Sequence, residues 1–111
     1  MSPFVWFHNH SENPKQTKDF YEQLASWQSS DGPAGTTMFQ VEKAPMAGLG
    51  VKEGGPAGWL PYLQVDDVAA ATKRALKLGG TLVREKTRGP AGEYSVVRDP
   101  GGATVALWQK A

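Results

Sequence analysis

The sequence predicts an α+β fold built from two βαβββ modules. Residues 59–110 read as one strand, one helix and three further strands, and residues 3–52 read as a looser copy of that order. One constant offset aligns the two halves, and it pairs Trp6 with Leu60, His8 with Tyr62, Asn13 with Asp67, and Leu24 with Leu78. Self-similarity of this kind is the sequence signature of an internal duplication. We therefore expect the same supersecondary unit to occur twice.

The two helices have the clearest signals. Asn13 and Pro14 begin the first helix, because Asn is a favoured N-cap and Pro suits the first helical position. Its predicted buried stripe consists of Thr17, Phe20, Tyr21 and Leu24. The second helix has an Asp at its N-cap and paired glycines after its last turn, where a left-handed residue is needed. Its predicted buried stripe consists of Val68, Ala71, Ala75 and Leu78.

The strands are predicted from runs of β-branched and aromatic residues between turn residues. In the first module they cover residues 4–10, 27–30, 36–41 and 46–51. In the second module they cover a run that starts at Trp59, then residues 81–84, 93–98 and 103–109. Asp99-Pro100-Gly101-Gly102 predicts a tight reversal, because Pro and Gly suit its successive positions.

Length and composition predict one domain over residues 1–111. A chain of 111 residues can bury a core without disulfides or a structural metal. Within it we expect a first module at about 3–52, a flexible linker at 53–58 and a second module at about 59–110.

The charge pattern excludes several kinds of partner. Twelve basic and eleven acidic residues leave a net charge of +1 without a run of like charge, so we expect no nucleic-acid and no membrane partner. Cysteine is absent, which excludes disulfides, thiolate metal sites and cysteine nucleophiles. The chain shows neither a signal peptide nor an apolar run of membrane-spanning length, so a soluble cytoplasmic protein is the expectation.

Several short motifs occur in an order that is typical of one superfamily. They are Phe20-Tyr21 in the first helix, Val65-Asp66-Asp67-Val68 before the second, Leu78-Gly79-Gly80 after it, and Asp99-Pro100-Gly101-Gly102 before the last strand. With two modules in this length, the whole chain resembles the glyoxalase, bleomycin-resistance and extradiol-dioxygenase superfamily, also called vicinal oxygen chelate. The Trp-Leu-Pro-Tyr opening of the second module resembles its small single-domain bacterial branch. The resemblance implies a curled mixed β-sheet cup with helices on the outside, and a homodimer.

The resemblance also locates the positions at which metal-using members bind their ion. These members place His, Gln or Glu on the first and last strands of each module. The corresponding positions here are Trp6, about Gly48, Leu60 and Ala106, and none can bind a metal through its side chain. We therefore expect neither the superfamily's metal nor another cofactor. His8 and His10 are the remaining candidates for a divalent metal, and they supply two ligands at most.

The candidate ligand-binding residues follow from strand alternation. Trp6, His8 and His10 share one face of the first strand. Tyr62 occupies the place of His8 in the second module, so we expect a phenol and an imidazole to face one cavity and treat both as candidate catalytic residues. The set of predicted ligand-binding residues is Trp6, His8, His10, Tyr62, Gln64 and Trp108. Small residues at positions 48, 50 and 106 leave room beside them.

Each of these residues also has a purely structural interpretation. His8 and His10 are compatible with exposed strand-end residues, or with neutral imidazoles that exchange a hydrogen bond with a ligand. Trp6, Tyr62 and Trp108 are compatible with ordinary core aromatics.

Three functions remain open from the sequence. The first is binding of a small, partly apolar or aromatic molecule without a metal, in the manner of resistance-type members of the superfamily. The second is a metal-dependent lyase, isomerase or dioxygenase that uses His8 and His10. The third is a domain whose surface binds a partner protein.

Overall fold

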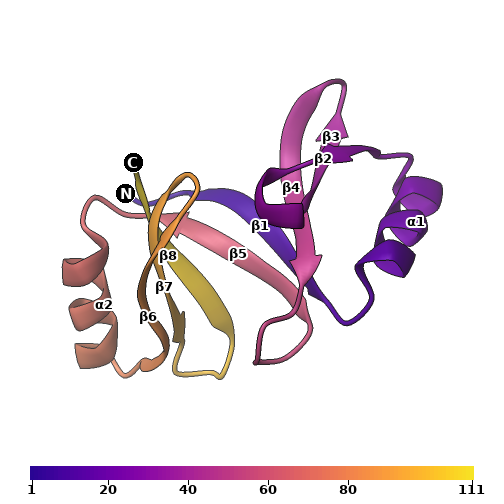
Figure 1. Cartoon of the computed structure of the whole chain (residues 1–111). Coiled ribbons are helices and arrows are strands. Elements are labelled where there is room, and N and C mark those ends of the chain that lie inside the picture. The colour runs from indigo at the N-terminus through magenta and orange to yellow at the C-terminus, as the bar shows by residue number, and fades with distance from the viewer. The chain divides into compact units, whose positions relative to one another are not determined.

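The computed structural model describes all residues, 1–111, and the chain divides into two compact units. The N-terminal unit is Trp6–Leu60, and the C-terminal unit combines Met1–Val5 with Pro61–Ala111. The first residues join the C-terminal unit, where the Gln64 N–H donates to the Pro3 carbonyl at 2.9 Å. Each unit contains one helix and a mixed sheet, so the predicted α+β class is confirmed (Figure 1).

The N-terminal unit has the predicted order of elements. They are β1 (Phe4–Ser11), α1 (Pro14–Ala25), β2 (Gln28–Asp31), the 3-10 turn η1 (Pro33–Gly35), β3 (Thr37–Val41) and β4 (Ala44–Val51). The strand order is β2-β3-β4-β1, with β1 parallel to β4 and the other pairs antiparallel. The predicted cap is present, because the Gln16 N–H donates to Asn13 Oδ1 at 3.2 Å. The turn before β4 falls on residues 42–43, slightly earlier than predicted.

The core of the N-terminal unit lies between α1 and its sheet. Phe39, Ala47 and Leu49 are buried there, and the Tyr21 and Trp27 rings pack against them. These two rings stack with centroids 5.0 Å apart. The predicted buried stripe of α1 is wrong in two places, because Phe20 is 56% exposed and Leu24 is 68% exposed. Tyr21 alone of the three large apolar residues in that stripe points at the core.

The C-terminal unit repeats the same plan. Its elements are β5 (Gly58–Gln64), which begins in the N-terminal unit, then α2 (Val68–Lys77), β6 (Thr81–Gly89), β7 (Gly92–Arg98) and β8 (Thr104–Lys110). The strand order is β5-β8-β7-β6, with β5 parallel to β8. β6 is longer than the predicted strand 81–84, because the charged run that follows Val83 forms an exposed outer strand. Charged residues are common on such edges.

The core of the C-terminal unit lies between α2 and its sheet. Val68, Val97 and Leu107 are buried, and Leu63, Val65, Ala71 and Ala75 pack against them. Leu78 was predicted to be buried, but it is 65% exposed because it follows the last helical residue. Gly79 then adopts φ +98°, the left-handed conformation that the paired glycines predicted. No helix of the protein is long and apolar enough to cross a membrane.

Candidate functional site

The sheet of the N-terminal unit presents Trp6 and His8 on the face opposite α1. His8 lies beside Gly48 in the parallel pairing of β1 and β4. A Cβ built on Gly48 would lie 2.7 Å from His8 Nδ1 and 3.3 Å from Trp6 Nε1, and one built on Gly50 would lie 3.1 Å from His8 Nε2. The two glycines therefore make the room that the imidazole occupies. The predicted common face of Trp6 and His8 agrees with this packing.

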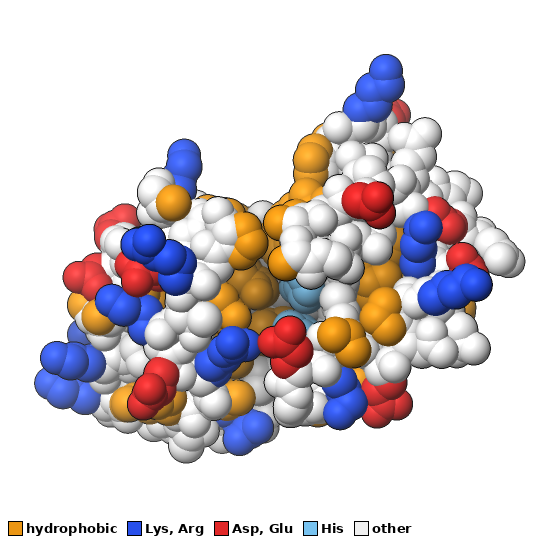
Figure 2. All heavy atoms as spheres, in the orientation of Figure 1, with side chains coloured by type: hydrophobic (Ala, Val, Ile, Leu, Met, Phe, Trp, Pro, Cys, Tyr) orange, Lys and Arg blue, Asp and Glu red, His pale blue; other side chains and the backbone are white.

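His10 extends the same group toward the end of β1. The His8 and His10 rings are tilted against each other, with centroids 4.9 Å apart. Burial, and secondarily the neighbouring His10, lower the pKa of His8 to about 4. His8 is therefore a neutral imidazole at pH 7, with one nitrogen that donates and one that accepts. Figure 2 shows histidine atoms at the molecular surface, so this group is within reach of solvent.

The residues at the positions where metal-using members bind their ion do not fit that metal. Trp6 offers an indole, Gly48 has no side chain, and Leu60 and Ala106 offer only aliphatic groups. No group of three or more His, Cys, Asp or Glu side chains is placed where it could hold a metal ion. His8 and His10 alone do not complete the three or four protein ligands that such sites use.

The sheet of the C-terminal unit presents Tyr62 on the face opposite α2. Tyr62 pairs with Ala106, and Gln64 pairs with Trp108, in the parallel register of β5 and β8. Tyr94 pairs with Trp108 across β7 and β8, and its ring centroid lies 6.0 Å from that of Tyr62. All three predicted residues of this unit, Tyr62, Gln64 and Trp108, therefore lie on one face. Leu63 points the other way, toward the α2 core.

A second phenol and a cation accompany Tyr62. The Arg84 guanidinium carbon lies 5.5 Å from the centroid of the Tyr94 ring, within the range of a cation–π contact. Burial, and secondarily Tyr94, raise the pKa of Tyr62 to about 12, while Arg84 acts weakly in the opposite direction. Tyr62 is therefore a protonated phenol at neutral pH, which can donate a hydrogen bond.

The structure thus brings the predicted residues together in two groups. Trp6, His8 and His10 belong to the N-terminal unit, and the remaining three belong to the C-terminal unit. That His8 and Tyr62 face one cavity stays a prediction. Sequence reasoning did not assign Tyr94 and Arg84 to the site. Tyr94 could have been found from its alternation with Val96, but the pairing of β6 shifts register on both sides of Arg84, which conceals the face of that residue.

Comparison with known proteins agrees with this fold. The family described as the glyoxalase-like domain matches residues 6–108. The protein therefore belongs to the glyoxalase-like domain family. A crystal structure of a glyoxalase/bleomycin resistance protein/dioxygenase superfamily member from Vibrio splendidus 12B01 has the same fold, with a TM-score of 0.66, 13% identity and full coverage of both chains.

Two curated relatives are more similar in sequence. "Putative glyoxylase CFP32" of Mycobacterium tuberculosis is 32% identical over 116 residues, which cover 94% of this chain and 44% of that protein. "Anthracycline biosynthesis protein DnrV" of Streptomyces peucetius is 29% identical over 127 residues, which cover 96% of this chain and 46% of that protein. The chain thus spans less than half the length of these relatives.

Proposed function

We propose that this glyoxalase-like domain binds a small, partly apolar or aromatic molecule without a metal, and that each unit offers the helix-free face of its strands for contact. The observation that carries the proposal is the uncharged state of both central polar residues. Burial lowers the pKa of His8 to about 4, so its imidazole is neutral at pH 7, and Tyr62 is a neutral phenol there as tyrosines ordinarily are. Such groups can donate and accept hydrogen bonds with a neutral ligand.

The surroundings of these two residues support an aromatic ligand. Trp6 lies beside His8, and Tyr94 and Trp108 share the face of Tyr62. Flat rings of this kind supply large contact areas and stack on other rings. The relative named for anthracycline biosynthesis, DnrV, also favours a molecule with aromatic rings. An anthracycline is therefore the first probe.

The test is a calorimetric titration of an anthracycline into wild-type protein and two variants. Tyr62→Phe keeps the ring and removes the hydroxyl, which leaves a ligand polar group unpaired at a cost of about 1 to 3 kcal/mol, or roughly 5- to 150-fold in affinity. His8→Ala is expected to weaken binding by at least as much. Native mass spectrometry of freshly purified protein can detect a small molecule that co-purifies, and that molecule then replaces the anthracycline as the probe.

Tyr21→Phe is the matched control for these variants. The Tyr21 hydroxyl accepts a hydrogen bond from Trp59 Nε1 at 3.0 Å, and its ring packs in the α1 core. Tyr21→Phe removes a phenol hydroxyl, as Tyr62→Phe does, but on the helix-covered side of a sheet. The affinity for the anthracycline should therefore stay unchanged. Unchanged affinity in both His8→Ala and Tyr62→Phe would contradict the proposal.

One observation favours a second function, a metal-dependent lyase, isomerase or dioxygenase. The centroids of the His8 and His10 rings lie 4.9 Å apart. Two imidazoles can contribute to a divalent metal site whose remaining ligands come from a substrate. Elemental analysis of protein purified without an affinity tag separates the two functions. A stoichiometric divalent metal that disappears in His8→Ala would favour the enzyme.

A further inference from the structure

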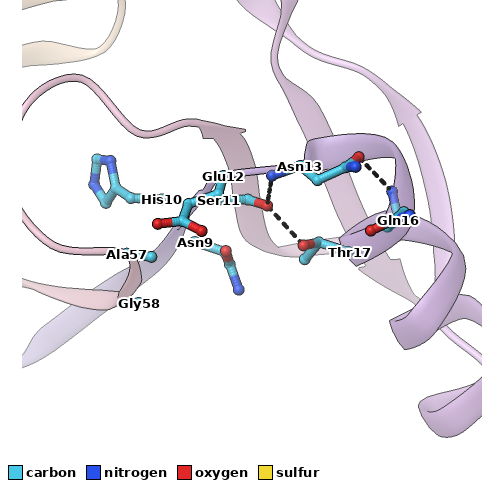
Figure 3. Close-up of a pocket in the computed structure, with 9 residues that line it drawn as sticks. All are labelled: Asn9, His10, Ser11, Glu12, Asn13, Gln16, Thr17, Ala57 and Gly58. Atoms are coloured by element: carbon cyan, nitrogen blue, oxygen red, sulfur yellow. Dashed lines mark hydrogen bonds between the residues drawn. The ribbon is translucent and has the colours of Figure 1, made fainter.

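A hollow lies at the end of β1, next to the first turn of α1 (Figure 3). It has a volume of about 310 Å³ and lies wholly within the N-terminal unit. Its walls are the end of β1, the start of α1 and the loop before β5. The lining residues that carry polar side chains are Asn9, His10, Ser11, Glu12, Asn13, Gln16 and Thr17. A second hollow of about 320 Å³ shares Asn9, Gln16 and Thr17 and continues to the Phe20 and Tyr21 rings.

Three of the polar side chains in this region, Ser11, Asn13 and Thr17, have hydrogen-bond partners within the protein. The Ser11 and Thr17 hydroxyls share a hydrogen bond of 2.7 Å, and Ser11 Oγ also accepts the Asn13 N–H at 2.9 Å. Asn13 Oδ1 accepts the Gln16 N–H. Figure 3 shows these bonds on the α1 side of the hollow. They hold the wall in a defined shape.

Asn9 differs from these neighbours. It is only 8% exposed, and its side-chain amide makes no hydrogen bond to another protein group. It lines both hollows and projects from β1 between the loop at Gly58 and Thr17 of α1 (Figure 3). Its polar atoms keep contact with solvent in the hollow, so they are available to a hydrogen-bonding partner from outside the chain.

The equivalent place in the C-terminal unit is filled with apolar side chains. The offset that pairs His8 with Tyr62 pairs Asn9 with Leu63 and Thr17 with Ala71. Leu63 and Ala71 both pack against the α2 core. The same scaffold can therefore accommodate an aliphatic residue, Leu63, at this position. The N-terminal unit has an amide, Asn9, at the equivalent position.

The geometry points to a binding site for a neutral carboxamide attached to an apolar or aromatic group. An amide offers one donor and one acceptor side by side, and a second amide complements both through two N–H···O bonds. An anion offers acceptors only, so it leaves the Asn9 oxygen unpaired, and the Glu12 carboxylate repels it. The apolar part of the ligand extends along the second hollow toward Tyr21 and Phe20.

Benzamide is the probe, because it joins a primary carboxamide directly to an aromatic ring. In an NMR titration of ¹⁵N-labelled protein we expect the side-chain amide signals of Asn9 and Gln16 to move together, with a dissociation constant of about 1 mM for so small a ligand. Benzoate and N,N-dimethylbenzamide should bind at least about tenfold more weakly, since each lacks the donor that the Asn9 oxygen requires.

Asn9→Leu removes the donor and the acceptor and imitates Leu63 of the other unit. It should weaken benzamide at least about tenfold, while the melting temperature stays the same or rises because an apolar side chain then packs at a largely buried position where the amide makes no hydrogen bond within the chain. Gln28→Leu is the matched control, because it removes an exposed amide of β2 outside the hollow and should leave binding unchanged. If Asn9→Leu does not fold, Asn9→Asp keeps the size, removes the donor, and should weaken benzamide similarly.

Two results would overturn the inference. One is a benzamide titration that moves neither the Asn9 nor the Gln16 side-chain signals. The other is unchanged benzamide affinity in folded Asn9→Leu. Tyr62→Phe distinguishes this site from the proposed function, since it should weaken the anthracycline and leave benzamide binding at the hollow unaffected.

Discussion

The two units apply one plan to the interface between first strand and helix, but with different side chains at the equivalent positions. In the C-terminal unit, Leu63 and Val65 of the first strand and its flank pack with Ala71 and Ala75 of the helix, and a Thr72–Ser95 hydrogen bond of 2.8 Å joins α2 to β7. In the N-terminal unit, the equivalent residues are Asn9, Ser11, Thr17 and Tyr21. There the interface is held by the Ser11–Thr17 hydrogen bond and contains a hollow. A duplicated fold therefore tolerates a polar interface in one copy when the other large contacts, here Tyr21, Trp27 and Phe39, maintain the core.

The largest expected effect comes from exchanging residues between the two interfaces. Leu63→Asn puts an amide among apolar neighbours that offer it no partner, so we expect a loss of about 2 to 4 kcal/mol in the free energy of unfolding. The reciprocal Asn9→Leu should be neutral or stabilising, by up to about 1 kcal/mol. Urea unfolding of both variants measures the asymmetry. Equal destabilisation by the two changes would show that the interfaces do not differ as described.

The next largest effect is a pH dependence of stability that arises from His8 and Tyr62, the equivalent residues on the helix-free faces. The folded-state pKa of His8 is lowered to about 4 from 6.5, so the unfolded chain binds the proton more readily between those values. Stability should be full above pH 6.5 and fall by about 1 to 3 kcal/mol as the pH drops toward 4. Urea unfolding at pH 7 and pH 5 measures this loss. His8→Phe should remove most of the slope, and a slope that persists in this variant would assign the titration to another group.

Tyr62 should respond at the opposite end of the pH scale. Its folded-state pKa is raised to about 12 from 10, so stability is full below pH 10 and decreases as the pH rises from 10 toward 12. The matching control is Tyr62→Phe, which should remove that alkaline contribution while retaining the ring. An unchanged alkaline slope in this variant would show that the Tyr62 phenol titrates as it does in the unfolded chain.

The smallest expected effect concerns the partners of these two residues in the neighbouring strands. Gly48 pairs with His8, whereas Ala106 pairs with Tyr62. A Cβ at position 48 would lie 2.7 Å from His8 Nδ1, so Gly48→Ala must displace the imidazole, at a cost of about 1 to 2 kcal/mol. NMR titration of His8 should show its pKa move up toward 6.5 as the ring becomes more exposed. Gly101→Ala is the control, because only the Asp99 carboxylate lies near its added methyl group, at 3.4 Å. An unchanged His8 titration in Gly48→Ala would contradict the packing described for this face.

Much of the fold could be predicted because its signals are local. The N-caps at Asn13 and Asp67 and the left-handed Gly79 depend on a few neighbouring residues, and the structure confirms all three. The buried stripes failed at Phe20, Leu24 and Leu78 because burial depends on how far each sheet extends beneath its helix. Helical periodicity shows which residues share a face, but it does not show where the covering surface ends.

The sequence by itself determined the repeated order of elements, the glyoxalase-like family and the alternation that puts His8 and Tyr62 on the helix-free faces. Strand alternation and capping act over a few residues, so they can be read along the chain. Only the tertiary structure showed that Gly48 and Gly50 hold the His8 ring, that Tyr94 and Arg84 accompany Tyr62, and that Asn9 faces a hollow. Those contacts join strands distant in sequence, where register and bulges decide which side chains meet.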